Sequence, residues 1–568
     1  MQAVTDRAAV DLRLYRVAWL PVLLAVVVLM FSLEGVPDPI EPVTPPGTFE
    51  PDRATRQARE IVAAAPSREP GSDGDQTIAS LVTDRFEEVA AGATTTQEFE
   101  GSFDGDDVEL TNVLLSLPGD SQQTIVVLAP RDAATGPGAA SSAAATGILI
   151  ELANALGVAG HEKSIVLAST SGGAQGAAEL LAGLPESGSV EAVIGIYQPG
   201  AIERRPPFVL TGSTGETSAP VQLERTAELV VQTQAQESSS EASGLTQLAR
   251  LAIPAGLGPQ APLIAAGFDA ISISSAGERP LAASDDGVED LSPEGIDAFG
   301  RAIQLTIGAV DVAPDGLEHG PGAHLELGDN LVPGWTLSLL ALALLLPAAV
   351  AAVDGCARAA RRRQRIGGGM AWAAARALPL LGALAIVYLL ALVGVVPRPP
   401  FPFDPGLYEA GGRAAVTFAL GLIALAAGAV LLRLLGVTAT RAPVSAPAAL
   451  GAVAVIAALV VWIANPYLAL LIAPAAHVWL VGVGEPTVVR RVAVLVCSAL
   501  AVVPLVLALV AISGDLELGA TAPWTLTLML ADGQIGFAVA VAGCFLGGTL
   551  LGASALALRR YHAVPAET

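Results

Sequence analysis

The chain has 568 residues, 52% of them hydrophobic and 15% charged, which allows one soluble domain beside a membrane domain. Its charge is uneven: residues 34–329 contain 44 acidic and 13 basic residues, an excess that should repel nucleic acid and anionic lipid headgroups. All three cysteines follow residue 355, which excludes a disulfide framework or a thiolate zinc site in the acidic region.

The first apolar run, residues 17–33, follows three basic residues, Arg7, Arg13 and Arg16. A helix of about 20 apolar residues crosses the hydrocarbon core of a bilayer, and flanking basic residues stay in the cytoplasm. No small-residue cleavage site follows the run. The pattern therefore predicts an uncleaved signal anchor over 17–33, with residues 1–16 in the cytoplasm.

A linker with a first helix is predicted over 34–75, and an extracytoplasmic domain over 76–330. Helical spacing of apolar residues predicts helices over 53–65, 76–92, 146–156, 177–182, 224–236 and 293–309. Short apolar runs between turn signals predict strands over 112–117, 124–129, 164–168, 192–197 and 270–274. This alternation indicates an α/β fold with a largely parallel sheet covered on both faces, and with sites at the carboxyl ends of the strands.

The region 331–558 contains seven further apolar runs, which predict an all-α transmembrane domain. The expected spans are 335–353, 373–396, 414–435, 447–465, 467–483, 492–513 and 534–558. With the first run, this makes a bundle of about eight spans. The break at Asn465–Pro466 predicts either a hairpin between two spans or a kink in one long helix.

Basic residues in the short loops set the expected orientation. The strongest basic loop, Arg358 to Arg365, follows the second span. The expected spans place five further basic residues on the same side of the membrane: Arg441, Arg490, Arg491, Arg559 and Arg560. Basic loops stay inside, so both termini, including the tail 559–568, are expected in the cytoplasm and the acidic domain outside a plasma membrane. A single lysine, Lys163, among many Ala, Gly and Arg residues indicates a GC-rich bacterial genome.

Five segments between Thr111 and Ala309 resemble, in the right order, the co-catalytic zinc aminopeptidase family. Residues 111–119 are similar to the strand and turn before the metal site, and VVLAPRD (126–132) to a strand ending in A-H-x-D. The segment 138–156 resembles a G-A-D-D-N-x-S-G turn with its helix, and 164–176 a strand ending in D-G-E-E-x-G. Residues 282–303 resemble the closing H-T-x-x-D turn and helix. The resemblance implies the fold of that family.

In that family two zinc ions share a bridging carboxylate, and a glutamate acts as general base. At the family's two histidine positions this chain has Pro130 and Ala282, and at the bridging aspartate it has Ser141. The general-base glutamate and the glutamate ligand beside it correspond to Gly173 and Ala174. The third carboxylate ligand corresponds to Tyr197. Proline, glycine and alanine offer no ligand atom, and serine and tyrosine are poor zinc ligands. Of the family's site residues, only the aspartate at position 132 is kept in this chain. The resemblance therefore implies a pseudo-peptidase without metal or cofactor.

The whole layout is similar to the peptidase-like membrane subunit of the eukaryotic GPI transamidase. One N-terminal span, a peptidase-like outer domain and about seven further spans carry this likeness. No motif in the membrane block supports it, and the transamidation reaction is not carried over.

The leading hypothesis is a non-catalytic scaffold or recognition subunit whose outer domain binds a peptide, lipid-linked or protein partner. Its expected partners are the lipid bilayer and other membrane or extracytoplasmic proteins, and not nucleic acid. The residues expected to line the old active-site groove are Arg131, Asp132, Ser141, Ser142, Tyr197 and Gln198.

Two other functions remain open on the sequence. A transporter or lipid-handling protein would use the helices, with the outer domain as a gate, and would need buried charges or broken helices repeated in two halves. A hydrolase with non-metal chemistry would use Ser141 or Ser171 as nucleophile. His319 and His324 are expected to be juxtamembrane residues, and His477, inside an apolar run, an interfacial or packing residue.

Overall fold

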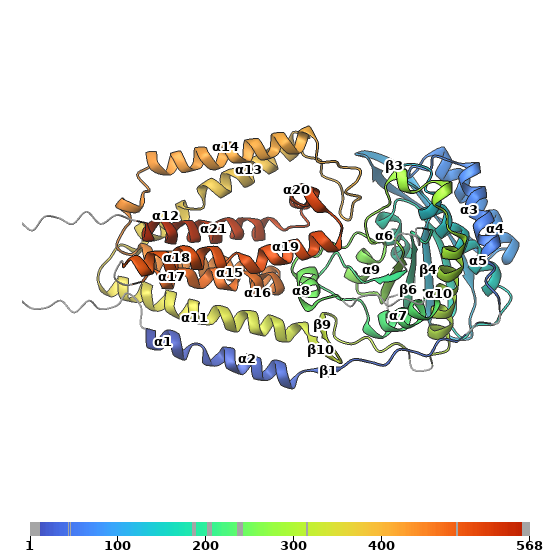
Figure 1. Cartoon of the computed structure of the whole chain (residues 1–568), viewed down its shortest axis with the longest axis horizontal. Helices are drawn as coiled ribbons and strands as arrows, with labels where there is room; N and C mark the ends of the chain where they lie inside the picture. Colours follow the sequence, from blue (N-terminus) through green and yellow to red (C-terminus); the bar gives the residue numbers. More distant parts are fainter. Residues whose placement is uncertain are drawn as a thin grey trace, which may run out of the picture.

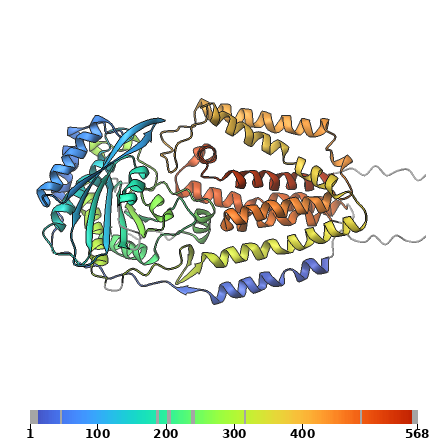
Figure 2. The same ribbon diagram turned by 180° about the vertical axis from the view of Figure 1, so that it is seen from behind.

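The computed structural model has two parts, an α/β domain and a bundle of apolar helices (Figure 1). The described residues are 12–43, 45, 47–183, 189–200, 207–235, 242–313, 316–483 and 487–558. Figure 2 shows from behind that the two parts lie end to end. The first helices, α1 (Leu12–Val17) and α2 (Leu20–Phe31), lie in the bundle beside α11 (Gly334–Arg361), although the α/β domain separates them in sequence.

The α/β domain contains a seven-stranded sheet in the order β2-β3-β5-β4-β6-β8-β7. The strands are β2 (Thr94–Phe103), β3 (Asp106–Leu117), β4 (Thr124–Pro130), β5 (Ser164–Thr170), β6 (Val190–Tyr197), β7 (Phe208–Leu210) and β8 (Ala270–Ser274). The central strands β5, β4, β6 and β8 run parallel, whereas β2, β3 and β7 pair antiparallel. The sheet is therefore mixed, and the expected largely parallel sheet is correct only for its centre.

The β2–β3 hairpin accounts for most of the difference from the expected sheet. Its two-residue turn, Asp104 and Gly105, has φ values of 51° and 91°. Positive φ at both central residues matches the twist of a hairpin, and Asp-Gly is a preferred pair for it. β2 lies at the sheet edge with most side chains only partly buried, so it lacks the apolar pattern that reveals an inner strand.

Helices cover both faces of the sheet. They are α3 (Pro51–Ala64), α4 (Asp73–Val89), α5 (Ala144–Leu156), α6 (Ala174–Gly183), α7 (Val221–Ala235), α9 (Gln260–Ala265) and α10 (Pro293–Asp311). α5 and α10 pack on the face away from the bundle, with α3 outside them, and α6 and α9 pack on the opposite face (Figure 1).

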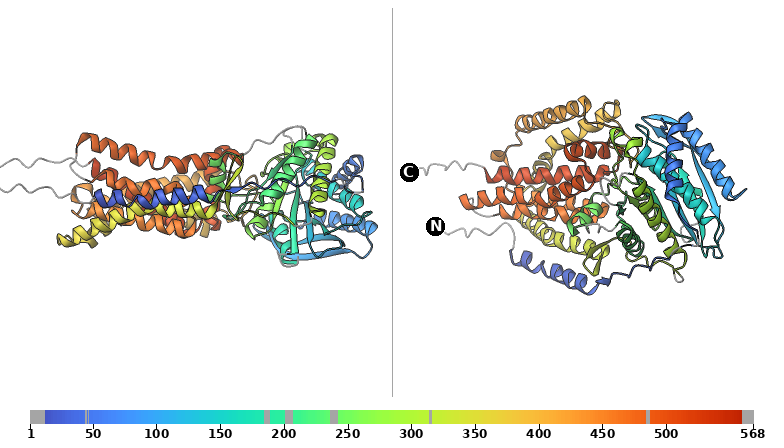
Figure 3. Two further views of the ribbon diagram at one scale, coloured as in Figure 1. Left: turned by 90° about the horizontal axis from the view of Figure 1, so that it is seen from below. Right: turned by 45° about the vertical axis from the view of Figure 1, so that its right-hand side comes forward.

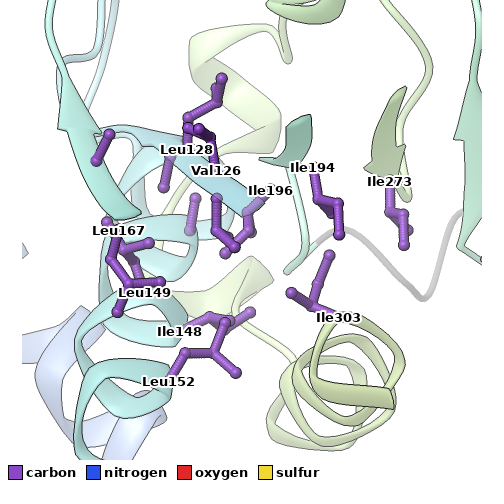
Figure 4. Close-up of a cluster of buried hydrophobic side chains, with 14 of the residues drawn as sticks. Val126, Leu128, Ile148, Leu149, Leu152, Leu167, Ile194, Ile196, Ile273 and Ile303 are labelled. Carbon is purple, nitrogen blue, oxygen red and sulfur yellow. The ribbon is translucent and has the colours of Figure 1, made fainter. Parts of the chain in front are cut away.

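The core lies where the parallel strands meet α5 and α10 (Figure 4). Ile194 of β6, Ile273 of β8 and Ile303 of α10 have no exposed surface. Each buried side chain of this size stabilises the fold by roughly 1.5–3 kcal/mol relative to an exposed one. The central strands are buried on both faces, which is why each is a continuous apolar run in the sequence.

Among the described residues, seven helices are long and apolar enough to cross a membrane. They are Arg13–Phe31, Ala139–Leu156, Gly334–Arg361, Gly412–Arg441, Ala446–Ala464, Val488–Asp515 and Phe537–Ala557. One of them, Ala139–Leu156, is 89% buried inside the α/β domain and is therefore a core helix. A pair bent by 47°, α12 (Ile366–Ala375) and α13 (Leu378–Leu392), adds a further candidate span.

The remaining helices complete the bundle. They are α14 (Gly412–Leu434), α15 (Ala446–Ala464), α16 (Pro466–Ile472), α17 (Val478–Val481), α18 (Val488–Leu500), α19 (Val503–Asp515), α20 (Ala522–Asp532) and α21 (Phe537–Ala557). α1 begins and α21 ends at the end of the bundle remote from the α/β domain (Figure 3). Sidedness in a membrane stays a prediction.

The break at Asn465–Pro466 is a hairpin. Asn465 has an extended backbone, with φ −153° and ψ 102°, and it ends α15. α16, the 3₁₀ turn Ala473–His477 and α17 then pack back along α15. The sequence left open a hairpin or a kink in one long helix, and the structure has the hairpin.

One short helix of the α/β domain, α8 (Gly244–Ala252), packs on the bundle against α16 and α19. Asn465 joins the two parts, because its Nδ2 donates to the carbonyl oxygens of Leu251 (3.0 Å) and Ala252 (3.4 Å) while its Oδ1 accepts from the Leu468 N–H (2.7 Å). One side chain thus caps the end of α8 and the start of α16.

A small antiparallel sheet lies where the chain passes between the two parts. β1 (Glu34–Gly35) pairs with β10 (Asn330–Pro333), which also pairs with β9 (His324–Leu327). This sheet joins the segment after α2 to the segment before α11. The two chain connections between the α/β domain and the bundle therefore lie side by side.

Candidate functional site

A cavity of about 190 Å³ lies at the carboxyl ends of β4, β5 and β6. Parallel strands bring the loops that follow them to one edge of the sheet, where sites of α/β folds form. Eight of the positions singled out in the sequence line this cavity: Pro130, Asp132, Ser141, Ser142, Gly173, Ala174, Tyr197 and Gln198. Arg131 and Ala282 are not among its lining residues.

Ser141 is held by Asp286, a residue that the sequence analysis did not single out. The Ser141 N–H donates to one Asp286 carboxylate oxygen (2.9 Å), and the Ser141 hydroxyl donates to the other. Asp286 lines the cavity, and burial raises the pKa of its carboxyl. The signal was present: Asp286 falls on the aspartate of the H-T-x-x-D turn pattern that starts at Ala282.

Arg131 lies beneath the cavity, and the expectation that it lines the groove is wrong. Its side chain is fully buried, with Nε 2.8 Å from the Asp75 carboxylate. It also donates to the carbonyl oxygens of Ser169 (3.1 Å) and Thr111 (2.6 Å). Alternate residues of an extended segment point to opposite sides, so Asp132 enters the cavity while Arg131 turns under it.

Arg68 fixes the wall of the cavity from the segment expected to be a linker. Its guanidinium is fully buried and donates to Pro137 O (2.9 Å), Gly138 O (3.2 Å) and Ser142 Oγ (2.9 Å). Gly138 has φ 56°, and an added Cβ would approach Arg68 to 2.7 Å. The guanidinium of Arg68 therefore holds the loop that carries Ser141. No local sequence pattern predicts this contact.

Asp132 carries the least satisfied carboxylate of the cavity. Its Oδ1 is buried and has no hydrogen-bond partner. Burial, and then the negative charge of Asp75, raise the pKa of Asp132 to about 7. A buried acceptor without a donor is unfavourable, so a ligand that donates a hydrogen bond or brings a positive charge would stabilise it.

A loop of the helical bundle closes the cavity from the other side. The Pro-rich segment between α13 and α14 contributes Pro402, Phe403, Asp404 and Tyr408 to the lining. Trp524 of α20 anchors this loop by donating to the Tyr408 carbonyl oxygen (2.9 Å). This segment lies between the expected spans 373–396 and 414–435, which predicts the outer side for it, but no local sequence pattern indicates that it lies over the α/β site.

The lining of the cavity is acidic, although the buried Arg68 and Arg131 behind it offset part of the negative charge. Four carboxylates line it, from Asp132, Asp286 and Asp404 and from Asp104 at its rim, while no Lys, Arg or His is among the lining residues. Charges of one sign around a low-dielectric cleft add to one another, because water screens them poorly. The arrangement therefore favours a cationic ligand.

The residues present do not fit a pair of zinc ions. Pro130, Gly173, Ala174 and Ala282 have no ligand atom in their side chains, and the Tyr197 hydroxyl donates to the Glu278 carbonyl oxygen (3.3 Å). In the part of the chain that the structure describes, no group of three or more His, Cys, Asp or Glu side chains is placed to hold a metal ion. The positions that match the family's ligands therefore lack the histidine nitrogens and carboxylate oxygens that zinc takes.

The hydroxyl and imidazole groups considered for other chemistry lie apart from one another. Ser171 is fully buried and donates to Asp75 (2.5 Å). His161 and His319 face Asp311 and Asp269, and His324 Nδ1 lies 3.0 Å from the Pro321 carbonyl oxygen. None of these histidines lines the cavity with Ser141.

His477 lies in the bundle and contacts the first helix of the chain. Its Nε2 is 2.9 Å from the Leu344 carbonyl oxygen, and its Nδ1 is 3.2 Å from the Tyr15 hydroxyl. These contacts join α1, α11 and the turn before α17, which is a packing role.

The stability of the α/β domain is expected to fall as pH rises from about 4 to about 7. Burial raises the pKa of Glu151 to about 7, as it does for Asp132, so the folded state binds more protons than the unfolded chain in this window. Where the native state holds the extra protons, the free energy of unfolding decreases with pH. Thermal melts of the full chain at pH 5, 6 and 7 would measure this slope. Asp132→Asn with Glu151→Gln should flatten it, and an unchanged slope would contradict the assignment.

No protein-family model matches this sequence, and a search of curated proteins finds no match. Among solved structures, the chain is similar to a glutaminyl cyclase of an Acidobacteriales bacterium (17% identity, TM-score 0.39, covering 49% of this chain and 99% of that one). It is also similar to a zinc aminopeptidase from Bacillus subtilis (10% identity, TM-score 0.38, 46% of this chain and 95% of that one). A third is a leucine aminopeptidase precursor from Bacteroides thetaiotaomicron (14% identity, TM-score 0.33, 47% of this chain and 99% of that one).

Proposed function

We propose that this protein is a non-catalytic recognition subunit of a membrane, whose α/β domain binds the ammonium group of a ligand such as the amino terminus of a peptide. The observation that carries the proposal is the acidic cavity, where the buried Asp132 Oδ1 has no partner and no basic side chain lines the wall. At about 190 Å³ the cavity is smaller than typical ligand sites of roughly 300–1,000 Å³, so it suits one terminal residue.

The absence of catalysis is proposed from the side chains that remain. An aminopeptidase of the resembled family needs metal ligands and a glutamate base, and Pro130, Gly173 and Ala174 supply neither. Ser141 could only pass its proton to Asp286, since no histidine lines the cavity. What these residues can do is position a cation by hydrogen bonds and charge.

The proposed setting is a bacterial plasma membrane, with both termini inside and the α/β domain outside. Basic side chains support this orientation, because Arg358, Arg441 and Arg490 lie where α11 ends, before α15 begins and where α18 begins. All three places are at the end of the bundle remote from the α/β domain (Figure 1). Such clusters mark the cytoplasmic side. Packing of the helices against other membrane proteins, as in a scaffold, is part of the same proposal.

Titration of the purified full chain with leucinamide is expected to show saturable binding, whereas N-acetyl-leucinamide, which lacks the ammonium group, should not bind. Asp132→Asn should weaken leucinamide at least about tenfold, the effect of losing roughly 1.4 kcal/mol. Binding should strengthen as pH rises toward 7, because ionised Asp132 is the better partner and the amine stays protonated. Isothermal titration calorimetry at pH 5.5 and 7.0 would measure both effects.

The matched control is Asp84→Asn, which removes an exposed carboxylate of α4 far from the cavity lining and should leave binding unchanged. If N-acetyl-leucinamide bound as tightly as leucinamide, recognition of the ammonium group would be refuted. The absence of catalysis is tested by measuring the zinc content of the purified chain and its hydrolysis of leucine p-nitroanilide. Stoichiometric zinc together with turnover would refute the non-catalytic assignment.

A further inference from the structure

A second cavity, with a volume of about 850 Å³, lies between helices of the bundle and opens to its surface, because lining residues such as Gly536 and Gly543 are exposed. It is lined by α15, α16, α19, α20 and α21, and by Leu380 of α13. The lining is almost entirely apolar, and the volume falls in the range of roughly 300–1,000 Å³ that ligand sites occupy. This cavity is separate from the acidic one, and the proposed binding of an ammonium group there makes no use of it.

The shape of the second cavity suits a hydrocarbon chain. Along α21 its lining extends from Gly536 to Leu550, and along α16 and the following turn from Asn465 to Ala475. At a rise of 1.5 Å per residue, the stretch on α21 is about 21 Å long. Half of a bilayer's hydrocarbon core is about 15 Å deep. The lining on α21 is therefore longer than the hydrocarbon depth of one leaflet, which leaves room for an acyl chain.

The polar lining of this cavity gathers at its end near the α/β domain. Gln534 is held there because its Nε2 donates to the carbonyl oxygens of Thr214 and Pro254, both at 2.8 Å. Asn465 is held by its caps on α8 and α16. Glu216, from the loop before α7, is the one charged residue of the lining, and no hydrogen bond or ion pair is formed by it with any described residue.

Space inside the cavity is open at Gly543 of α21. An added Cβ there would meet no atom within 4 Å. Apolar walls that face an empty gap lose their dispersion contacts, so an occupant that fills the gap is favourable. In a bilayer the hydrocarbon available to fill it is a lipid chain.

We propose that this cavity binds one acyl chain of a membrane lipid whose headgroup carries an amine, with the chain along α21 and the amine at Glu216. The apolar wall supplies the affinity for the chain, and Glu216 supplies the choice of headgroup. Burial also raises the pKa of Glu216 to about 7, and a neighbouring ammonium would favour its ionised form.

The test uses the full chain, stripped of lipid in mild detergent and mixed with phosphatidylethanolamine or phosphatidylglycerol of identical acyl chains. Lipid that remains bound after gel filtration is counted by mass spectrometry. We expect about one phosphatidylethanolamine per chain, held roughly tenfold more tightly than phosphatidylglycerol. Gly543→Phe should lower retention of both lipids at least about tenfold, because the ring fills the space that the chain needs.

The matched control is Gly421→Phe on α14, where an added Cβ also meets no atom within 4 Å but which does not line the cavity. It should retain lipid as the wild type does. Glu216→Gln should keep the lipid and lose the headgroup preference, and Glu216→Lys should reverse the preference toward phosphatidylglycerol. These two variants test the site even if Gly543→Phe folds poorly. Equal retention by Gly543→Phe and wild type, or equal retention of both lipids by wild type, would overturn the proposal.

Discussion

Arg131→Met is expected to destabilise the α/β domain by about 3–5 kcal/mol, the effect of leaving a buried charge without its partner. The side chains of Arg131 and Asp75 are 1% and 2% exposed, and their closest nitrogen and oxygen atoms are 2.8 Å apart. Without the guanidinium, the Asp75 carboxylate keeps only the Gly71 N–H (3.1 Å) and the Ser171 hydroxyl. The carbonyl oxygen of Thr111 also loses a donor.

Thermal unfolding of the full chain in detergent would measure this loss, with an expected fall of roughly 10 °C at 2–4 °C per kcal/mol. Arg301→Met is the matched control, because Arg301 and Asp297 form an ion pair at 47% and 38% exposure, where the expected loss is below about 1 kcal/mol. Arg131→Met combined with Asp75→Leu should recover part of the stability, since the Asp75 charge is no longer left buried without its partner. Equal melting of the two single variants would mean that the buried pair does not stabilise the fold.

Arg250→Ala is expected to loosen the attachment of α8 to the helical bundle by about 2–3 kcal/mol. Arg250 bridges the two parts of the molecule, with one nitrogen 2.7 Å from Glu278 and another 2.6 Å from Asp515 of α19. The Glu278 side chain is 2% exposed, so it would stay buried without its cation. The expected loss is below that of Arg131 because Arg250 is itself 22% exposed.

Hydrogen exchange of the α8 amides would report the change, since 2–3 kcal/mol corresponds to roughly 30- to 150-fold faster exchange if α8 opens locally. Arg279→Ala is the control at the same boundary, because the partly buried Arg279 donates to a neutral group, the Glu517 carbonyl oxygen (3.3 Å). It should change exchange less than about fivefold. Exchange in α8 that is the same in both variants would show that the bridge does not hold the two parts together.

The inner architecture of the α/β domain could be predicted from the sequence because burial leaves a clear pattern there. Strands β4, β5 and β6 are continuous apolar runs, and the helices after them carry apolar residues at helical spacing. β2 and α8 were missed for physical reasons. The edge strand β2 is mostly polar and half exposed, and α8 has only nine residues, whose apolar side packs against helices far along the chain.

The candidate site was predictable where it follows strand ends and unpredictable where it depends on distant segments. Pro130, Gly173 and Tyr197 come directly at or after parallel strands, so topology alone brings them together. Arg68 and Asp404 reach the same place from segments about 60 residues before and 270 residues after β4, where no local pattern indicates a site. The Pro-rich loop between α13 and α14, which contains Asp404, likewise lies over the cavity without a local pattern that indicates it.

The double cap at Asn465 sets an order of events during synthesis. The two carbonyl groups that it caps precede it by 214 and 213 residues. A ribosome that adds about 5–20 residues per second needs roughly 10–40 s to cover that distance. Through this interval the nascent α8 has left the tunnel with its C-terminal carbonyls uncapped and its apolar stripe uncovered. The attachment of α8 to the bundle can therefore form only after the hairpin of α15 and α16 has been made.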